Sequence, residues 1–100
     1  MTKEEALVRL EEFRILIDDL DRRIVELLND RTRVVEDIGR VKRQATLPIY
    51  EPRREEQVMA NIESSNKGPL TPEALRRVFE RIIDEMRTVQ RLRIESDGDR

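Results

Sequence analysis

The sequence predicts an all-α protein with three helices per chain, one very long, one short and one of medium length, assembled as a homodimer. Three observations predict this class. Apolar residues recur in steps of three and four from Leu10 to Val41. The chain has only three aromatic residues and three glycines, whereas strands favour aromatic and β-branched residues. Its 20 basic and 22 acidic residues nearly balance, which is typical of solvated helical surfaces.

The first predicted helix runs from about Lys3 to about Ala45, and Gly39 is its only glycine. It is expected to end before Pro48, because the residue before a proline avoids helical geometry. Its apolar stripe follows a heptad rhythm that breaks at position 31, an arginine. The stripe consists of Leu10, Phe13, Ile17, Leu20, Ile24, Leu27, Val34, Ile38 and Val41.

Two shorter helices follow. The second is expected to begin at Pro52, with Glu51 in the cap position, and to end in the stretch SSNKGP. Thr71 followed by Pro72 predicts the start of the third helix. We expect one domain over residues 1–95 and a disordered tail over residues 96–100, where nothing apolar remains to be buried.

The length of the first helix predicts the dimer. A helix of about 40 residues is roughly 60 Å long, whereas a compact chain of this size has a radius of gyration of about 13 Å. Two shorter helices cannot cover the whole stripe, so the exposed remainder needs a partner. A second copy of the chain is the simplest one.

The composition excludes several classes of function. Without cysteine or histidine, the chain has no disulfide, no thiol nucleophile, and neither the commonest metal ligand nor the commonest general base. No calcium-binding loop is present, so we expect no metal. A net charge of −2 gives no general case for nucleic acid, and no apolar run could span a membrane. With no secretory signal at its start, the protein is expected in the cytoplasm. From the length of the chain we expect no fused catalytic domain.

Polar residues interrupt the apolar side of the first helix. Positions 31, 35 and 42 share a face, because eleven residues turn about 1,100°, close to three full turns. Arg31 and Lys42 therefore point the same way, and Gly39 between them leaves room for a ligand or a close helix. Two like charges facing an interior would repel each other, so an anion is expected there. In an antiparallel dimer, Arg14 could reach this patch of the partner chain.

The other helices carry similar interruptions. Arg54 and Glu55 lie one turn before the apolar residues of the second helix, and Gln90 follows Met86 by four residues on the third. With the arginines and the lysine of the first helix, these groups could hold a small dicarboxylate inside a helical bundle.

Each residue also has a purely structural interpretation. Arg31 could fix the register of a helical seam or extend to the surface. Lys42 could interact with the dipole at the end of its helix. Arg54 and Glu55 could form a solvated first turn, and Gln90 could be exposed near a helix end.

Taken in order, the set resembles the all-helical chorismate mutase family over residues 7–93. The shared pattern runs through Phe13-Arg14, IDDLDRRIVELLNDR ending at Arg31, the Gly39-x-x-Lys42 step, Glu51-x-x-Arg54-Glu55, and IIDEMRTVQ ending at Gln90. Two positions depart from it. Position 51, here glutamate, is often aspartate in the family, and position 86, here methionine, is often small and polar.

The resemblance implies the conversion of chorismate to prephenate, a pericyclic Claisen rearrangement that needs no cofactor, within phenylalanine and tyrosine biosynthesis. Arg31 and the partner chain's Arg14 would clamp the substrate carboxylates. Lys42 would donate to the ether oxygen and a carboxylate, and Gln90 would donate to the same ether oxygen. These donors would restrain a dianion and stabilise the charge that develops on the oxygen.

The resemblance further implies two entwined chains with two equivalent sites. Glu55 would accept a hydrogen bond from the ring hydroxyl, Glu51 and Arg54 would shape that end of the pocket, and Met86 stands at a position of substrate contact. A larger shikimate-pathway enzyme is a further partner compatible with this family. Two alternatives stay open: an isochorismate pyruvate-lyase on the same scaffold, and a non-catalytic helical dimerisation module.

Overall fold

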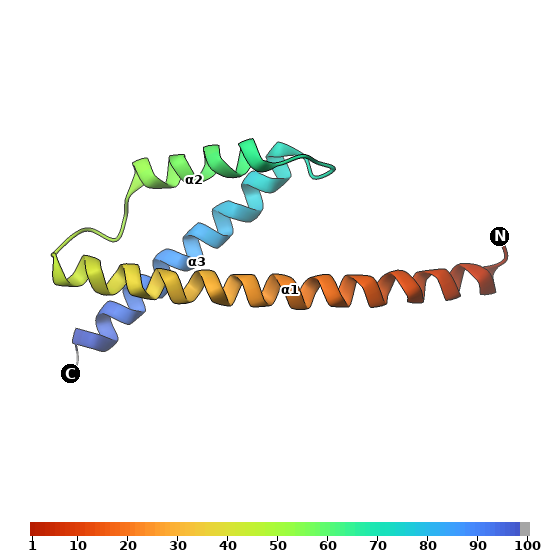
Figure 1. Cartoon of the computed structure of the whole chain (residues 1–100), viewed down its shortest axis with the longest axis horizontal. Coiled ribbons are helices and arrows are strands. Elements are labelled where there is room, and N and C mark those ends of the chain that lie inside the picture. The colour runs from red at the N-terminus through yellow and green to blue at the C-terminus, as the bar shows by residue number, and fades with distance from the viewer. Residues whose placement is uncertain (99–100) are drawn as a thin grey trace. The chain divides into compact units, whose positions relative to one another are not determined.

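The computed structural model describes residues 1–98, with side-chain burial given through residue 93. Figure 1 shows three helices in chain order, α1 (Lys3–Gln44), α2 (Pro52–Ser65) and α3 (Pro72–Gly98), and the described residues contain no strand. The predicted all-α class and the order of long, short and medium helices are confirmed. The predicted tail begins at residue 96, whereas α3 continues to Gly98; residues 99 and 100 lie outside the described part.

The chain forms two compact units, Met1–Arg33 and the part that begins at Val34. In the first unit, Thr2 and Glu5 cap the start of α1 reciprocally. The Glu5 N–H donates to Thr2 Oγ1 at 3.1 Å and the Thr2 N–H donates to Glu5 Oε2 at 3.4 Å, a capping box. No residue between 1 and 33 is buried. The stripe residues of this unit are exposed, from 45% for Leu20 to 67% for Leu27.

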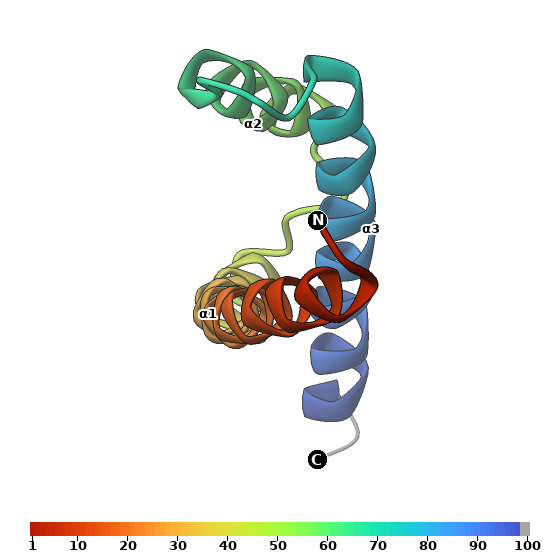
Figure 2. The ribbon, with the colours of Figure 1, turned by 90° about the vertical axis from the view of Figure 1, so that its right-hand side faces the viewer.

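The second unit has a small core. Its buried apolar residues come from all three helices and are Val35, Met59, Ile83 and Met86. Helices α2 and α3 pack against each other, and Figure 2 shows the end of α2 beside the beginning of α3, where residues 66–71 join them. Gly39 faces α3, since a Cβ added there would lie 3.5 Å from Cγ of Gln90.

The end of α1 presents two different faces in this unit. One face packs within the chain and carries the buried residues at positions 35, 39 and 42. The neighbouring face continues the heptad stripe, and its residues Val34, Ile38 and Val41 are 59%, 42% and 59% exposed. Because consecutive residues are 100° apart on a helix, packing on one face leaves the other uncovered.

A left-handed residue ends α1. Thr46 has a φ of 56°, a conformation usually taken by glycine at this place. The Leu47 N–H donates to the Lys42 carbonyl at 2.7 Å and the Thr46 N–H donates to the Arg43 carbonyl at 3.2 Å, so these two carbonyls in the last turn of α1 are satisfied. The chain then turns back toward the end of the helix that it has just left.

The predicted helix starts are correct, but the two caps differ. At α3, Thr71 Oγ1 accepts a hydrogen bond from the Ala74 N–H at 3.2 Å, as its hydroxyl predicts. At α2, Glu51 occupies the cap position before Pro52, but its side chain makes no capping hydrogen bond. Its carboxylate is engaged elsewhere.

Candidate active site

Lys42 lies in the last turn of α1 and is only 7% exposed. Its ammonium meets three oxygen acceptors. Nζ lies 2.9 Å from Gln90 Oε1, 3.0 Å from the Ile49 carbonyl and 2.8 Å from Glu51 Oε1. An ammonium has three N–H donors, so these contacts can account for all of them. A buried charge requires such compensation, and the structure therefore does not support Lys42 as a solvated residue at a helix end.

The turn after α1 brings two of these acceptors back to Lys42. With Thr46 in the left-handed conformation, the connection returns and places the Ile49 carbonyl within reach of Nζ. Glu51 follows at the start of α2 and directs its carboxylate to Lys42 instead of capping its own helix. The local fold of this connection thus assembles one side of the site.

Gln90 of α3 supplies the other side and is also 7% exposed. Because the Lys42 ammonium can only donate, the oxygen of the Gln90 amide must face it. The amide nitrogen is then the group available to donate to a ligand. Gln90 also lies against Gly39, so the predicted close approach of a helix at this glycine is found.

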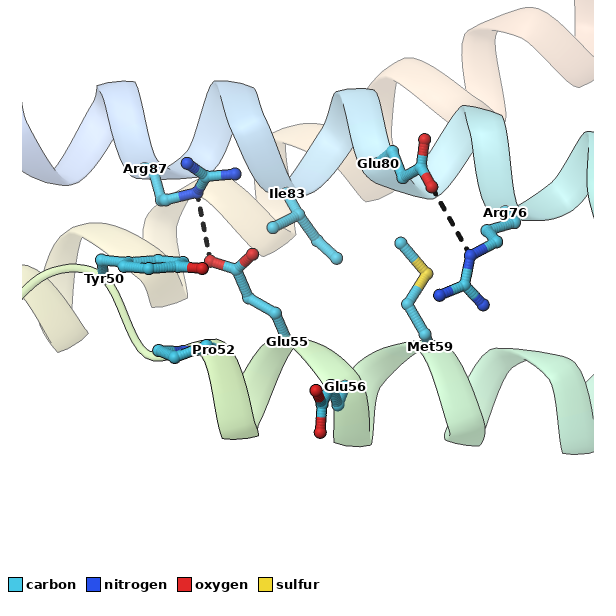
Figure 3. Close-up of a pocket in the computed structure, with 9 residues that line it drawn as sticks. All are labelled: Tyr50, Pro52, Glu55, Glu56, Met59, Arg76, Glu80, Ile83 and Arg87. Carbon is cyan, nitrogen blue, oxygen red and sulfur yellow. Dashed lines mark ion pairs between the residues drawn. The ribbon is translucent and has the colours of Figure 1, made fainter.

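Glu55 lies one turn after Glu51 on α2, its N–H bonded to the Glu51 carbonyl at 3.0 Å. Its carboxylate turns toward α3, where Oε2 is 3.1 Å from Arg87 Nε. Figure 3 shows Glu55 and Arg87 at one end of a pocket of about 260 Å³ between α2 and α3, with the ring of Tyr50 beside them. Arg87 Cζ is 5.4 Å from the centroid of that ring, within the range of a cation–π contact.

The remaining predicted site residues are more dispersed. Arg54 is exposed and its Nη1 lies 3.5 Å from Gln57 Oε1. Met86 is buried in the core of the second unit. Arg14 and Arg31 belong to the first unit, where Arg31 is half-buried and Arg14 lies 3.8 Å from Glu11. Within the second unit, the structure thus brings together Lys42, Glu51 and Gln90, and places Glu55 one turn away.

Three contributors were missed by the sequence analysis. The Ile49 carbonyl has no sequence signal, because every residue has one. Tyr50 stands in the seven-residue link 45–51, whose path cannot be predicted from its sequence. Arg87 does carry a signal, since it is a charged residue three positions before Gln90, at the border of the core face of α3.

The described residues contain no cluster of acidic side chains that could hold a metal ion, and none of their helices is long and apolar enough to cross a membrane. The groups that converge at Lys42 and Gln90 are hydrogen-bond donors and their acceptors. Such a site can bind an anion and stabilise negative charge on an oxygen.

Comparison with known proteins gives one consistent result. Residues 13–91 match the family model described as chorismate mutase type II. The bifunctional chorismate mutase/prephenate dehydratase of Pseudomonas aeruginosa is 39% identical over 80 residues, which cover 75% of this chain. This chain spans only 22% of the length of that relative.

Solved structures similar to this chain are also chorismate mutases. Chorismate mutase (form II) from Thermus thermophilus has a TM-score of 0.81 and 34% identity, covering 83% of this chain and 94% of that one. Chorismate mutase from Helicobacter pylori, solved in complex with prephenate, has a TM-score of 0.82 and 26% identity, covering 88% of this chain and 96% of that one.

Proposed function

The chain belongs to the chorismate mutase type II family, and from this membership we propose that it rearranges chorismate to prephenate. The observation that carries the proposal is the buried contact between Lys42 and Gln90. An ammonium and an amide that converge in a buried place can both donate to one oxygen of a bound anion. That is the requirement of a reaction in which an ether C–O bond breaks while a C–C bond forms.

The chemistry needs no proton relay, because the rearrangement is unimolecular and concerted. Catalysis comes from holding the dianion in a reactive geometry and from stabilising the charge that grows on the ether oxygen. In this proposal, substrate oxygens replace part of the acceptor set around Lys42 Nζ. Gln90 keeps its amide oxygen on Lys42 and donates from its nitrogen to the ether oxygen.

Glu51 has a defined part in this exchange. Its carboxylate neutralises Lys42 from 2.8 Å in the absence of substrate, and its side chain is about half exposed, so it can move aside into solvent. A substrate carboxylate then takes its place on the ammonium. Arg54, exposed on the next turn, shapes the same end of the site, and Glu55 accepts a hydrogen bond from the ring hydroxyl.

We further propose that two copies of the chain form a dimer with shared sites. The support is the exposed stripe in both units, including Ile17 at 54% and Ile24 at 53%. Fully burying an exposed side chain of this kind is worth about 1.5–3 kcal/mol, and about half of that remains to be gained where the side chain is half exposed, so a second chain that covers the stripe is favoured. In this dimer, Arg31 of one chain and Arg14 of the other bind the substrate carboxylates.

Three further expectations from the sequence stay predictions: a role in phenylalanine and tyrosine biosynthesis, a location in the cytoplasm, and an association with a larger enzyme of the same pathway. The relative from Pseudomonas aeruginosa, named as a mutase joined to a prephenate dehydratase, supports the first of these. A downstream enzyme that consumes prephenate would remove the product of the proposed reaction.

One assay separates the proposal from its alternatives. Purified protein is incubated with chorismate or with isochorismate, and loss of each is followed together with formation of prephenate or pyruvate. We expect prephenate from chorismate. Pyruvate release from isochorismate would indicate the lyase instead, and no turnover of either compound would indicate a non-catalytic helical module.

A further inference from the structure

We propose that Arg87 is a positioning residue for the reaction: it fixes the carboxylate of Glu55 at the place where the ring hydroxyl of the substrate must be accepted. The inference rests on the proposed function and adds to it a residue outside the predicted site. It starts from the pair itself, in which Arg87 Nε lies 3.1 Å from Glu55 Oε2, with side chains 31% and 26% exposed.

The pair lies one helical turn from the Lys42 site on both helices. Glu51, the cap residue of α2, contacts Lys42, and Glu55 follows four residues later. On α3, Gln90 contacts Lys42 and Arg87 precedes it by three residues. Helices α2 and α3 are therefore bridged at two successive levels, about 5.4 Å apart. The level of Lys42 and Gln90 holds the donors for the ether oxygen, and the level of Glu55 and Arg87 holds the acceptor for the ring hydroxyl.

Arg87 is itself held in place. Its guanidinium contacts the ring of Tyr50 with Cζ 5.4 Å from the centroid, and Asp84 Oδ1 lies 3.7 Å from its Nη2. Figure 3 shows Arg87 above the Glu55 carboxylate and the ring of Tyr50 beside it. Arg87 Nε lies beside Oε2, so Oε1 is the oxygen that would accept the hydroxyl in this proposal. A carboxylate fixed in this way loses little freedom when substrate binds.

The ion pair is not yet a good hydrogen bond. Arg87 Nε is buried, and its N–H finds no acceptor with hydrogen-bond geometry among the described residues, although Oε2 is close. A small rotation of the carboxylate would satisfy it. Catalytic hydrogen bonds are often poorly aligned before substrate is bound and improve in the complex, which is the behaviour expected of a positioning pair.

The chain offers a matched control. Arg76 of α3 also pairs with a glutamate of α2, Nη1 lying 2.9 Å from Glu63 Oε1, and the two side chains are 52% and 42% exposed. This second pair links the same helices far along them from Lys42, and Arg76 lies at the other end of the pocket from Arg87. If Arg87 only joined α2 to α3, replacing either arginine should have the same kind of effect.

The experiment compares Arg87→Met with Arg76→Met, since methionine keeps the apolar stem and removes the charge. We expect Arg87→Met to lower kcat/KM for chorismate about tenfold, as small misplacements of reacting groups do, and Arg76→Met to leave it within about twofold. Arg87→Lys, which keeps the charge without the planar guanidinium, should recover part of the loss. Thermal melting of each variant provides the comparison of stability.

A second readout isolates the hydroxyl. With a chorismate analogue that lacks the ring hydroxyl, the Arg87→Met effect should fall below about twofold, because the contact that Arg87 positions is then missing. In a Glu55→Gln background it should also fall below about twofold, because the carboxylate that pairs with Arg87 is then missing. Full activity of Arg87→Met, or equal losses for the two arginine variants, would overturn the inference while the mutase function stands.

If Arg87→Met does not fold, Arg87→Lys and Tyr50→Leu must show the same dependence on the hydroxyl, or the inference is wrong. Absence of any chorismate turnover by the unmodified protein would overturn the proposed function and this inference together.

Discussion

The two units of this chain follow one apolar rhythm, but only one of them builds a core. Among residues 34–93, four apolar side chains are buried, and charged residues of different elements meet. Between Met1 and Arg33, no residue is buried, and ion pairs such as that of Arg14 and Glu11 join neighbours on the same helix. The heptad pattern is equally regular in both units. The pattern alone therefore does not determine whether a helix packs within its own chain or against another chain.

This difference indicates that the two units have separate roles in the proposed enzyme. The second unit contains the groups that would act on the breaking bond, held by contacts within one chain. The first unit contributes Arg14 and an apolar surface, which would gain a function only against another chain. Mutations should therefore act differently in the two units.

The largest effect is expected from a charge in the exposed stripe. Leu20→Asp places a carboxylate on each chain at the proposed dimer contact, where an unpaired charge is strongly unfavourable. The folded dimer should be lost, as measured by light scattering and circular dichroism. Arg22→Asp, about 200° away around the same turn, is the control and should remain a dimer. A folded species of 11.9 kDa for the unmodified protein at micromolar concentration would contradict the dimer itself.

Next in size is the loss of the buried ammonium. Lys42→Ala should lower kcat by about 10²–10³, the usual cost of removing one donor to a developing oxyanion. The ratio kcat/KM should fall at least as far, since Lys42 would also contact a substrate carboxylate. Arg43→Ala, the exposed neighbour, should be nearly neutral. Steady-state kinetics on chorismate checks both; a Lys42→Ala protein with unchanged kcat would remove this residue from the mechanism.

Replacing the amide tests which group donates. In Gln90→Glu, the new carboxyl can donate to the ether oxygen only when protonated, and glutamate ordinarily has a pKa of about 4.3. Activity at neutral pH should fall about 10² and recover toward acidic pH. The unmodified protein has no histidine and should show a flat profile near neutrality. Full activity of Gln90→Glu at pH 7 and above would mean that Gln90 is not the donor.

Sharing of sites between chains predicts complementation. Arg14→Ala and Arg31→Ala should each reduce activity about tenfold to a hundredfold, the range for losing a hydrogen bond to a charged group. Mixed dimers regain one site with both arginines, so a refolded equimolar mixture should recover about a quarter of full activity by random pairing. If demonstrated heterodimers stay as inactive as the parents, Arg14 does not act in the partner's site.

The smallest effect concerns stability. Gly39→Ala should stabilise the chain by about 1 kcal/mol, since glycine is unfavourable within a helix. The added Cβ would make an ordinary contact 3.5 Å from Gln90 Cγ, so the packing of α1 on α3 has room for it. Chemical denaturation measures the gain. A loss of stability would show that α1 and α3 cannot accept even a methyl group here.

Much of the fold was predictable, because local signals state it directly. Pro52 begins a helix, Pro72 after the hydroxyl cap of Thr71 begins another, and Pro48 lies beyond the end of the first. For Glu51, the sequence predicted the cap position but not what its side chain binds. Its carboxylate pairs with Lys42 instead of capping α2. This interaction depends on how the chain turns back at Thr46, which no local sequence pattern predicts.

The site was predictable where its residues match the ordered pattern of the family that the sequence resembles. Lys42 and Gln90 were expected near each other, and the structure joins them directly. The contribution of Arg87 depends on facing Glu55 across two helices, which the letters of either helix alone do not reveal. Polar contacts between elements are the part of a site that a single sequence leaves open, because they depend on the relative rotation of the elements.

The uncovered stripe has a consequence for the physiology of the proposed dimer. If the first unit finds its core only in another chain, folding is a second-order process, and each tenfold dilution lowers the stability of the folded state by about 1.4 kcal/mol per dimer. The amount of working enzyme would then rise more steeply than the rate of synthesis when the protein is scarce. Expression level would itself be a control on flux, without any effector molecule.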